Sequence, residues 1–158
     1  SKAYCIPGHR MGAVVAGPAL RGEFVKAVDN IQLCPPRPPQ AALAWAVPAL
    51  RGWRAANRRL IAARGRMFRA ALAHAPGWRV DAHGAYFAWV RVPQGRDPGA
   101  PDGTTLAEQL AAEAGLVTLP GAFFGPGGER HLRLAYANAE EAVLAGVPDR
   151  LRLLAGQA

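Results

Sequence analysis

The chain has 158 residues, a length that suits one domain, and 51% of them are hydrophobic, enough to build a buried core. Its net charge of +8 would ordinarily suggest a nucleic acid or a membrane surface as partner. It contains no apolar run of about 18 residues or more, and its two cysteines lack a C-x-x-C spacing. We therefore expect no membrane partner, no metal site and no disulfide framework, in a reducing, cytoplasmic setting.

Much of the positive charge lies in one stretch of helix-forming residues. At about 3.6 residues per turn, its arginines spread around the helix axis instead of forming one stripe. This distribution favours a solvated helix surface over a nucleic-acid face, so we expect no nucleic-acid partner. The arginines are Arg51, Arg54, Arg58, Arg59, Arg64, Arg66 and Arg69.

The first elements in chain order are an apolar run, a helix and a proline segment. Residues 13–16 form an apolar run between glycines, a pattern typical of a buried strand. Residues 18–28 predict a helix because apolar side chains recur at every fourth position. Residues 34–39 contain four prolines, which exclude a helix interior and a central strand. We expect this segment to cross between two domains.

Residues 40–74 are rich in alanine, leucine and arginine and predict two consecutive helices. Strands and helices alternate after them, which indicates an α+β domain with a mainly antiparallel sheet. We expect strands at 78–80, 86–92, 116–119 and 131–137, a Pro/Gly/Asp loop at 94–103, and helices at 104–115 and 139–154, the last broken near 146–148.

The segment Ser1–Gly12 carries the residues with the clearest chemistry. A lysine directly follows a serine, and an arginine eight positions later stands between glycines. A lysine amine condenses with carbonyls, while a guanidinium forks onto phosphate oxygens in a way that an ammonium cannot. Glycines let the backbone come close to a ligand. This segment therefore indicates a covalent cofactor, with an ordinary polar loop as the alternative.

The spacing S-K-x-x-x-x-x-G-x-R-x-G, found at Ser1, Lys2, Gly8, Arg10 and Gly12, resembles the lysine motif of class I/II pyridoxal-phosphate (PLP) aminotransferases of fold type I. The resemblance implies that Lys2 forms the Schiff base with PLP and shuttles a proton at the substrate Cα. It also implies that Ser1 contributes to the cofactor site and that Arg10 binds the phosphate. An amino acid and a 2-oxo acid are the implied small-molecule partners, and a homodimer is the implied assembly.

Three downstream segments resemble the small domain of the same family: Gly84–Phe87, Leu119–Gly125 and His131–Ala137. The resemblance implies that Arg133 grips the substrate α-carboxylate. The residues support this role independently, because Arg133 stands between two leucines in a predicted strand and so points away from the leucine face. A planar guanidinium there suits a carboxylate held by two parallel hydrogen bonds. An edge-strand charge on a solvated face is the alternative.

Two other features carry no catalytic role in our interpretation. His9 and His131 stand close to Arg10 and Arg133, and we expect them to be surface residues or indirect supports of the site. The glycine-rich segment Gly125–Glu129 precedes a strand and not a helix N-terminus, so we assign it no phosphate.

We expect the chain to be the C-terminal part of a longer α/β protein. Residues 1–34 would end the large PLP-binding domain, 35–77 would form the interdomain helices, and 78–158 would form the small α+β domain with its antiparallel sheet packed by helices. The complete protein would transfer an amino group from an amino acid to a 2-oxo acid, and the isolated segment would be inactive.

Three alternative functions remain open at this point. The lysine motif predicts the cofactor but not which Cα bond breaks, so a PLP-dependent lyase or decarboxylase of the same fold is one alternative. The second is the aminotransferase-like effector domain of a transcription regulator, whose DNA-binding segment would lie upstream. The third is a stand-alone basic interaction domain.

Overall fold

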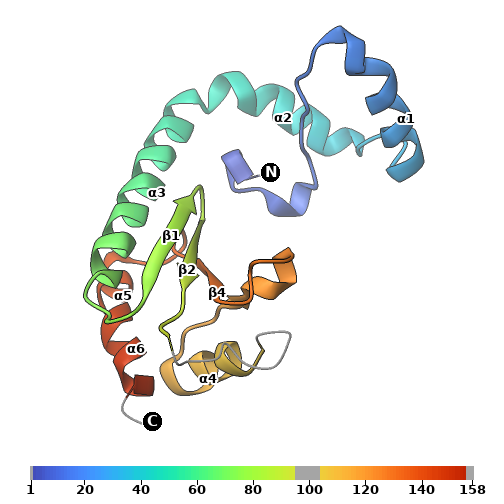
Figure 1. Ribbon diagram of the computed structural model, residues 1–158. Helices are drawn as coiled ribbons and strands as arrows, with labels where there is room; N and C mark the ends of the chain where they lie inside the picture. Colours follow the sequence, from blue (N-terminus) through green and yellow to red (C-terminus); the bar gives the residue numbers. More distant parts are fainter. Residues whose placement is uncertain (1, 95–103, 156–158) are drawn as a thin grey trace. The chain divides into compact units, whose positions relative to one another are not determined.

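The computed structural model describes residues 2–94 and 104–155 (Figure 1). The chain divides into two compact units, Ser1–Asn57 and Arg58–Ala158. Apart from its first residue, the expected loop at 94–103 lies outside the described residues. No helix in the described part of the chain is long and apolar enough to cross a membrane.

The first unit consists of short turns followed by helices. Two single-turn 3-10 helices precede an irregular segment, and a third leads directly into the first α-helix. These elements are η1 (Lys2–Tyr4), η2 (Pro7–His9), η3 (Pro18–Leu20), α1 (Arg21–Ile31), α2 (Arg37–Ala49) and the beginning of α3 (Arg51–Leu72). The helix expected at 18–28 and the two expected between 40 and 74 are confirmed.

The strand expected at residues 13–16 is wrong. Val14 is 71% exposed and Val15 98% exposed, and no described strand pairs with this segment. A strand requires hydrogen bonds to a neighbouring strand. The apolar run therefore lies as an exposed, irregular segment within the unit that contains it.

The proline segment behaves as expected only up to Pro36. Helix α2 begins at Arg37, so Pro38 and Pro39 lie in its first turn. Proline is tolerated there because the first amides of a helix have no partner within it. The expected end of the proline segment at 39 was therefore placed too late.

The second unit contains a four-stranded sheet in the order β1-β2-β4-β3, with every pair antiparallel. This confirms the antiparallel sheet predicted for the C-terminal part of the chain. Strand β3 has two residues where four were expected, and β4 lies between β2 and β3. The strands are β1 (Arg79–Gly84), β2 (Phe87–Arg91), β3 (Leu119–Pro120) and β4 (His131–Ala135).

Strand β1 contains a bulge at Asp81. Val80 pairs with Val90 and Ala82 pairs with Trp89, so Asp81 is an extra residue with no partner on β2. One extra residue shifts the alternation of side chains along the strand and bends it. The side chain of Asp81 therefore does not follow the regular alternation of side chains between the two faces of the sheet.

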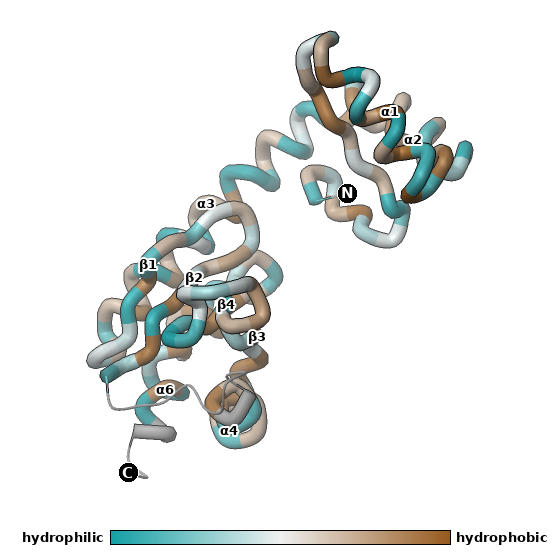
Figure 2. Tube along the Cα trace, turned by 45° about the vertical axis from the view of Figure 1, so that its right-hand side comes forward, coloured by the Kyte–Doolittle hydropathy of each residue, from teal (hydrophilic) through white to brown (hydrophobic). Residues whose placement is uncertain are grey.

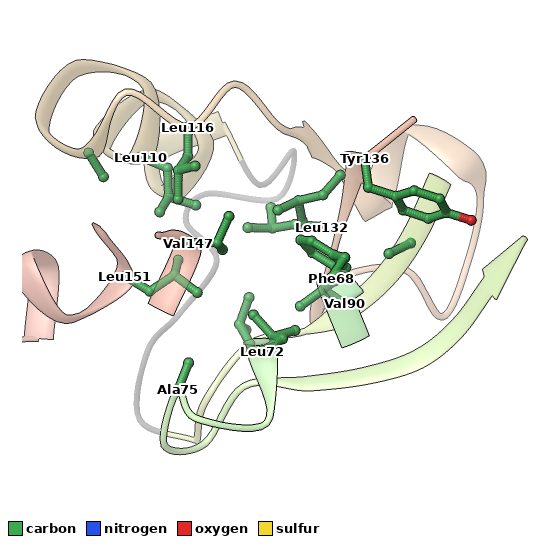
Figure 3. Close-up of a cluster of buried hydrophobic side chains, with 14 of the residues drawn as sticks. Phe68, Leu72, Ala75, Val90, Leu110, Leu116, Leu132, Tyr136, Val147 and Leu151 are labelled. Atoms are coloured by element: carbon green, nitrogen blue, oxygen red, sulfur yellow. The ribbon is translucent and has the colours of Figure 1, made fainter. Parts of the chain in front are cut away.

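One face of the sheet is covered by helices, and the core lies between the sheet and these helices (Figure 3). Val90 of β2 and Leu132 of β4 are fully buried against Phe68 and Leu72 of α3. The remaining helices complete this cluster. They are α4 (Thr104–Ala114), α5 (Glu141–Ala145) and α6 (Val147–Ala155).

Hydrophilic and hydrophobic residues alternate along α3, as its colouring shows (Figure 2). Its arginines are exposed except for the half-buried Arg64, whose Nη1 donates to the carbonyl oxygen of Ala137 at 2.5 Å. The apolar side of the same helix carries Gly65, which lets the ring of Tyr136 come close. The arginines of α3 are thus exposed, apart from Arg64.

Candidate functional site

The expected cofactor residues lie in the first unit. Lys2 begins η1 and is exposed, and its carbonyl oxygen accepts a hydrogen bond from the Cys5 amide at 3.1 Å. Arg10 follows η2 and is also exposed. Ser1 lies outside the described residues. The lysine and the arginine therefore belong to two successive turns of one compact unit.

The backbone of Arg10 holds a left-handed conformation, with φ of 52°. Such a conformation costs a non-glycine residue roughly 1–2 kcal/mol, so the turn must hold it in place. The amide and Nη1 of Arg10 both donate to the carbonyl oxygen of Pro7, at 3.3 and 3.0 Å. The guanidinium is thus turned back over its own turn and has further N–H donors available for an anion.

The surroundings of Arg10 suit an anionic ligand. The only acidic residues before residue 58 are Glu23 and Asp29, and Glu23 binds Lys26 at 3.0 Å. An added Cβ at Gly8 or Gly12 would meet no described atom within 4 Å, so the backbone there is open to approach. This set of an amine and a guanidinium fits a cofactor that carries both an aldehyde and a phosphate.

Arg133 lies on the second unit's sheet, on the face opposite the helices. Its neighbours Leu132 and Leu134 are buried in the core, which confirms the predicted alternation. Arg133 pairs in register with Trp89 of β2 and Leu119 of β3. Because β4 has a strand on either side, the alternative of an edge-strand charge is wrong.

Two aromatic rings contact the guanidinium of Arg133. Its Cζ lies 4.2 Å from the ring centroid of Phe87 and 4.5 Å from that of Phe124. Within residues 2–94 and 104–155, no carboxylate pairs with this half-buried cation. A half-buried cation without an acidic partner is a candidate anion-binding group.

The nearby carboxylate of Asp81 is engaged with three other groups. It accepts hydrogen bonds from Nε of Arg79 at 2.5 Å and Nε of Arg91 at 2.7 Å, and its Oδ2 lies 3.0 Å from Nε2 of His131. The hydrogen bond from Arg79, followed by that with His131, holds the pKa of Asp81 well below its usual range. Asp81 therefore remains ionised and offsets part of the positive charge at this end of the sheet.

His131 is 7% exposed, so the surface role considered for it is wrong. Its ring stacks on Trp89 with centroids 5.1 Å apart, and its Nδ1 is buried without a partner in the described part of the chain. Sequence reasoning missed Asp81 and both phenylalanines as parts of this site. The segments that hold Phe87 and Phe124 were recognised, but their contacts with Arg133 join separate segments of the chain.

We expect Asp81→Asn to lower the free energy of unfolding by about 1–3 kcal/mol at pH 7, because charge-assisted hydrogen bonds are lost. The folded state lowers the pKa of Asp81, so its contribution is complete above the carboxyl group's ordinary pKa of 3.8 and falls as the pH drops below that value. Urea unfolding at several pH values measures the difference between variant and wild type.

The matched control for this prediction is Asp149→Asn. Asp149 pairs with Arg152 within one turn of α6, and its side chain is 79% exposed. Such surface pairs contribute little to stability, so this variant should unfold like the wild type. A difference for Asp81→Asn that stayed constant from pH 7 down to strong acid would contradict the ionised cluster.

The described residues thus present two candidate groups: a lysine and an arginine in tight turns of the first unit, and a guanidinium without a carboxylate partner on the antiparallel sheet of the second. Residues 1–151 match the family described as aminotransferase class I and II, and the chain belongs to that family.

Individual relatives agree with this assignment. The chain is 33% identical over 148 residues to the 4-dedimethylamino-4-oxo-anhydrotetracycline transaminase OxyQ of Streptomyces rimosus, a match that covers 92% of this chain and 38% of OxyQ. It resembles the α-aminoadipate aminotransferase LysN of Thermus thermophilus with a TM-score of 0.75 and 26% identity, covering 95% of this chain and 39% of LysN. For the aromatic aminotransferase of Pyrococcus horikoshii, the TM-score is 0.75 and the identity 27%, covering 98% and 41%. The chain therefore spans about two fifths of the length of these relatives.

Proposed function

We propose that the complete protein is a PLP-dependent aminotransferase that moves an amino group from an amino acid to a 2-oxo acid. Lys2 would hold the cofactor through its amine and carry the proton at the substrate Cα. Ser1 and Arg10 would complete this chain's part of the cofactor site, with Arg10 binding the phosphate. Bound PLP supplies an electron sink for the charge that develops at Cα.

The observation that supports this proposal most strongly is the environment of the Arg133 side chain. Its guanidinium is half-buried on a central strand, contacts two aromatic rings and has no carboxylate partner in the described part of the chain. A substrate α-carboxylate supplies the missing anion in two parallel hydrogen bonds. Binding through Arg133 would hold the carboxylate end of the substrate in one orientation.

Arg133→Lys tests this role in the complete protein. A lysine keeps the charge but cannot form the two parallel hydrogen bonds, so amino-acid affinity should fall about 10- to 100-fold. Affinity for PLP should not change, because the cofactor contacts are assigned to other residues. Titration with amino acid and, separately, with PLP gives both values. A variant that keeps its amino-acid affinity but loses PLP would contradict the assignment.

Three further features belong to the same proposal. Residues 1–34 would end the large cofactor domain, 35–77 would link the domains, and 78–158 would be the small domain. The complete protein would act as a homodimer in the cytoplasm.

Product analysis of the complete enzyme separates transamination from lyase or decarboxylase chemistry, since only transamination releases the 2-oxo acid in step with amino-group transfer.

A further inference from the structure

Phe87 and Phe124 contact the same guanidinium from two different elements. Phe87 begins β2, and Phe124 ends η4 (Gly121–Phe124). Their ring centroids lie 4.2 and 4.5 Å from Cζ of Arg133. Phe87 is 39% exposed and Phe124 49% exposed, so neither residue is part of the buried core. Their contact with the cation is the feature that they share.

We propose that Phe87 and Phe124 are positioning residues for Arg133, which together fix its guanidinium with the N–H edge open to a substrate carboxylate. The inference rests on the proposed function, because it assumes that Arg133 binds the carboxylate. An aromatic ring attracts the flat face of a guanidinium and does not use its N–H groups as hydrogen-bond donors. The two rings therefore restrict the long arginine side chain before the substrate arrives and leave its hydrogen-bonding fork available.

The position of Phe124 is supported by further ring contacts. Phe124 meets Trp89 edge-on, with centroids 5.7 Å apart and an interplanar angle of 85°. Trp89 stacks on His131, whose Nε2 lies 3.0 Å from Oδ2 of Asp81. A continuous row of contacts thus runs from the charged cluster around Asp81 to the ring beside Arg133. These contacts hold the half-exposed Phe124 ring in a defined place.

The main test replaces each ring by leucine in the complete protein, which keeps an apolar side chain but removes the π face. The dissociation constant is measured for an amino acid and for the amine with the same side chain but no carboxylate. We expect Phe87→Leu and Phe124→Leu each to weaken amino-acid binding roughly three- to tenfold and to leave amine binding unchanged. Phe124→Tyr, which restores an aromatic face, should recover most of the amino-acid affinity.

Phe123→Leu is the matched control. Phe123 is the exposed neighbour of Phe124 on η4, and among the described residues the cation–π contacts of Arg133 are with Phe87 and Phe124, not with Phe123. This variant should bind both ligands like the wild type. Equal losses for amino acid and amine in Phe124→Leu, or a loss of the same size in Phe123→Leu, would overturn the positioning role.

Arg133→Lys separates a failure of this inference from a failure of the proposed function. If Arg133→Lys does not reduce the preference for the amino acid over the amine, the carboxylate role of Arg133 is wrong. If Arg133→Lys reduces that preference but neither leucine variant does, the carboxylate role stands and the positioning role is wrong. In the Arg133→Lys background, Phe124→Leu should cause little further loss, because contacting residues that act together are not additive.

Discussion

Lys2→Ala in the complete protein should lower the rate of amino-group transfer by about 10²- to 10⁴-fold or more, the largest effect that we expect from any single replacement. A positioned acid–base group alone contributes rate factors of that order. Lys2 is also the amine proposed to hold the cofactor covalently, so its loss removes two functions at once. Initial rates of 2-oxo-acid release measure the effect.

Lys26→Ala is the control for this replacement. Lys26 is the only other lysine of the chain, and its Nζ binds Glu23 on α1 at 3.0 Å. We expect that variant to keep full activity. Borohydride reduction of the loaded enzyme followed by peptide mapping should place the pyridoxyl adduct on Lys2. An adduct on any other lysine would refute the assignment.

Gly121→Ala should destabilise the second unit by more than about 4 kcal/mol. A Cβ at Gly121 would overlap the carbonyl oxygen of Gly128 and lie 2.6 Å from that of His131. Both obstacles are backbone atoms, and the second belongs to β4, so neither can move without disturbing the sheet. A loss of this size approaches the whole stability of many domains, about 5–15 kcal/mol. Chemical unfolding followed by circular dichroism measures it.

The same replacement at Gly52 provides the comparison. Gly52 lies in α3, where an added Cβ would meet no described atom within 4 Å. Alanine favours a helix over glycine by about 0.5–1 kcal/mol, so Gly52→Ala should stabilise the protein slightly. Similar unfolding curves for the two variants would show that the contact between Gly121 and Gly128 is less crowded than the structure describes.

The sequence predicted the helices well because their signals are local. Apolar residues at helical spacing define α1 and α3, and Gly115, with φ of 61°, follows the end of α4 as expected. The failed strand at 13–16 shows the opposite case. Strand formation depends on a partner elsewhere in the chain, which a short apolar run does not reveal.

The residues of the candidate site could be predicted only where they belong to a family motif or to the alternating side chains of a strand. Lys2, Arg10 and Arg133 came from family resemblance, and the strand pattern alone predicted which way Arg133 points. Their chemical roles stay predictions. The contact between Asp81 and His131 joins residues 50 positions apart, so no local pattern could indicate it. The aromatic contacts of Arg133 were missed for the same reason.

Because of the bulge at Asp81, the deletion of one codon would change the structure of β1. Because Asp81 is the unpaired extra residue, an in-frame loss of its codon would let Val80 and Ala82 pair as consecutive residues of a regular strand. The same event would remove the carboxylate that binds Arg79, Arg91 and His131. One deletion would therefore straighten the strand and leave three basic side chains without their acid. In related sequences, a strand that is shorter by this residue should therefore also lack the negative charge of Asp81.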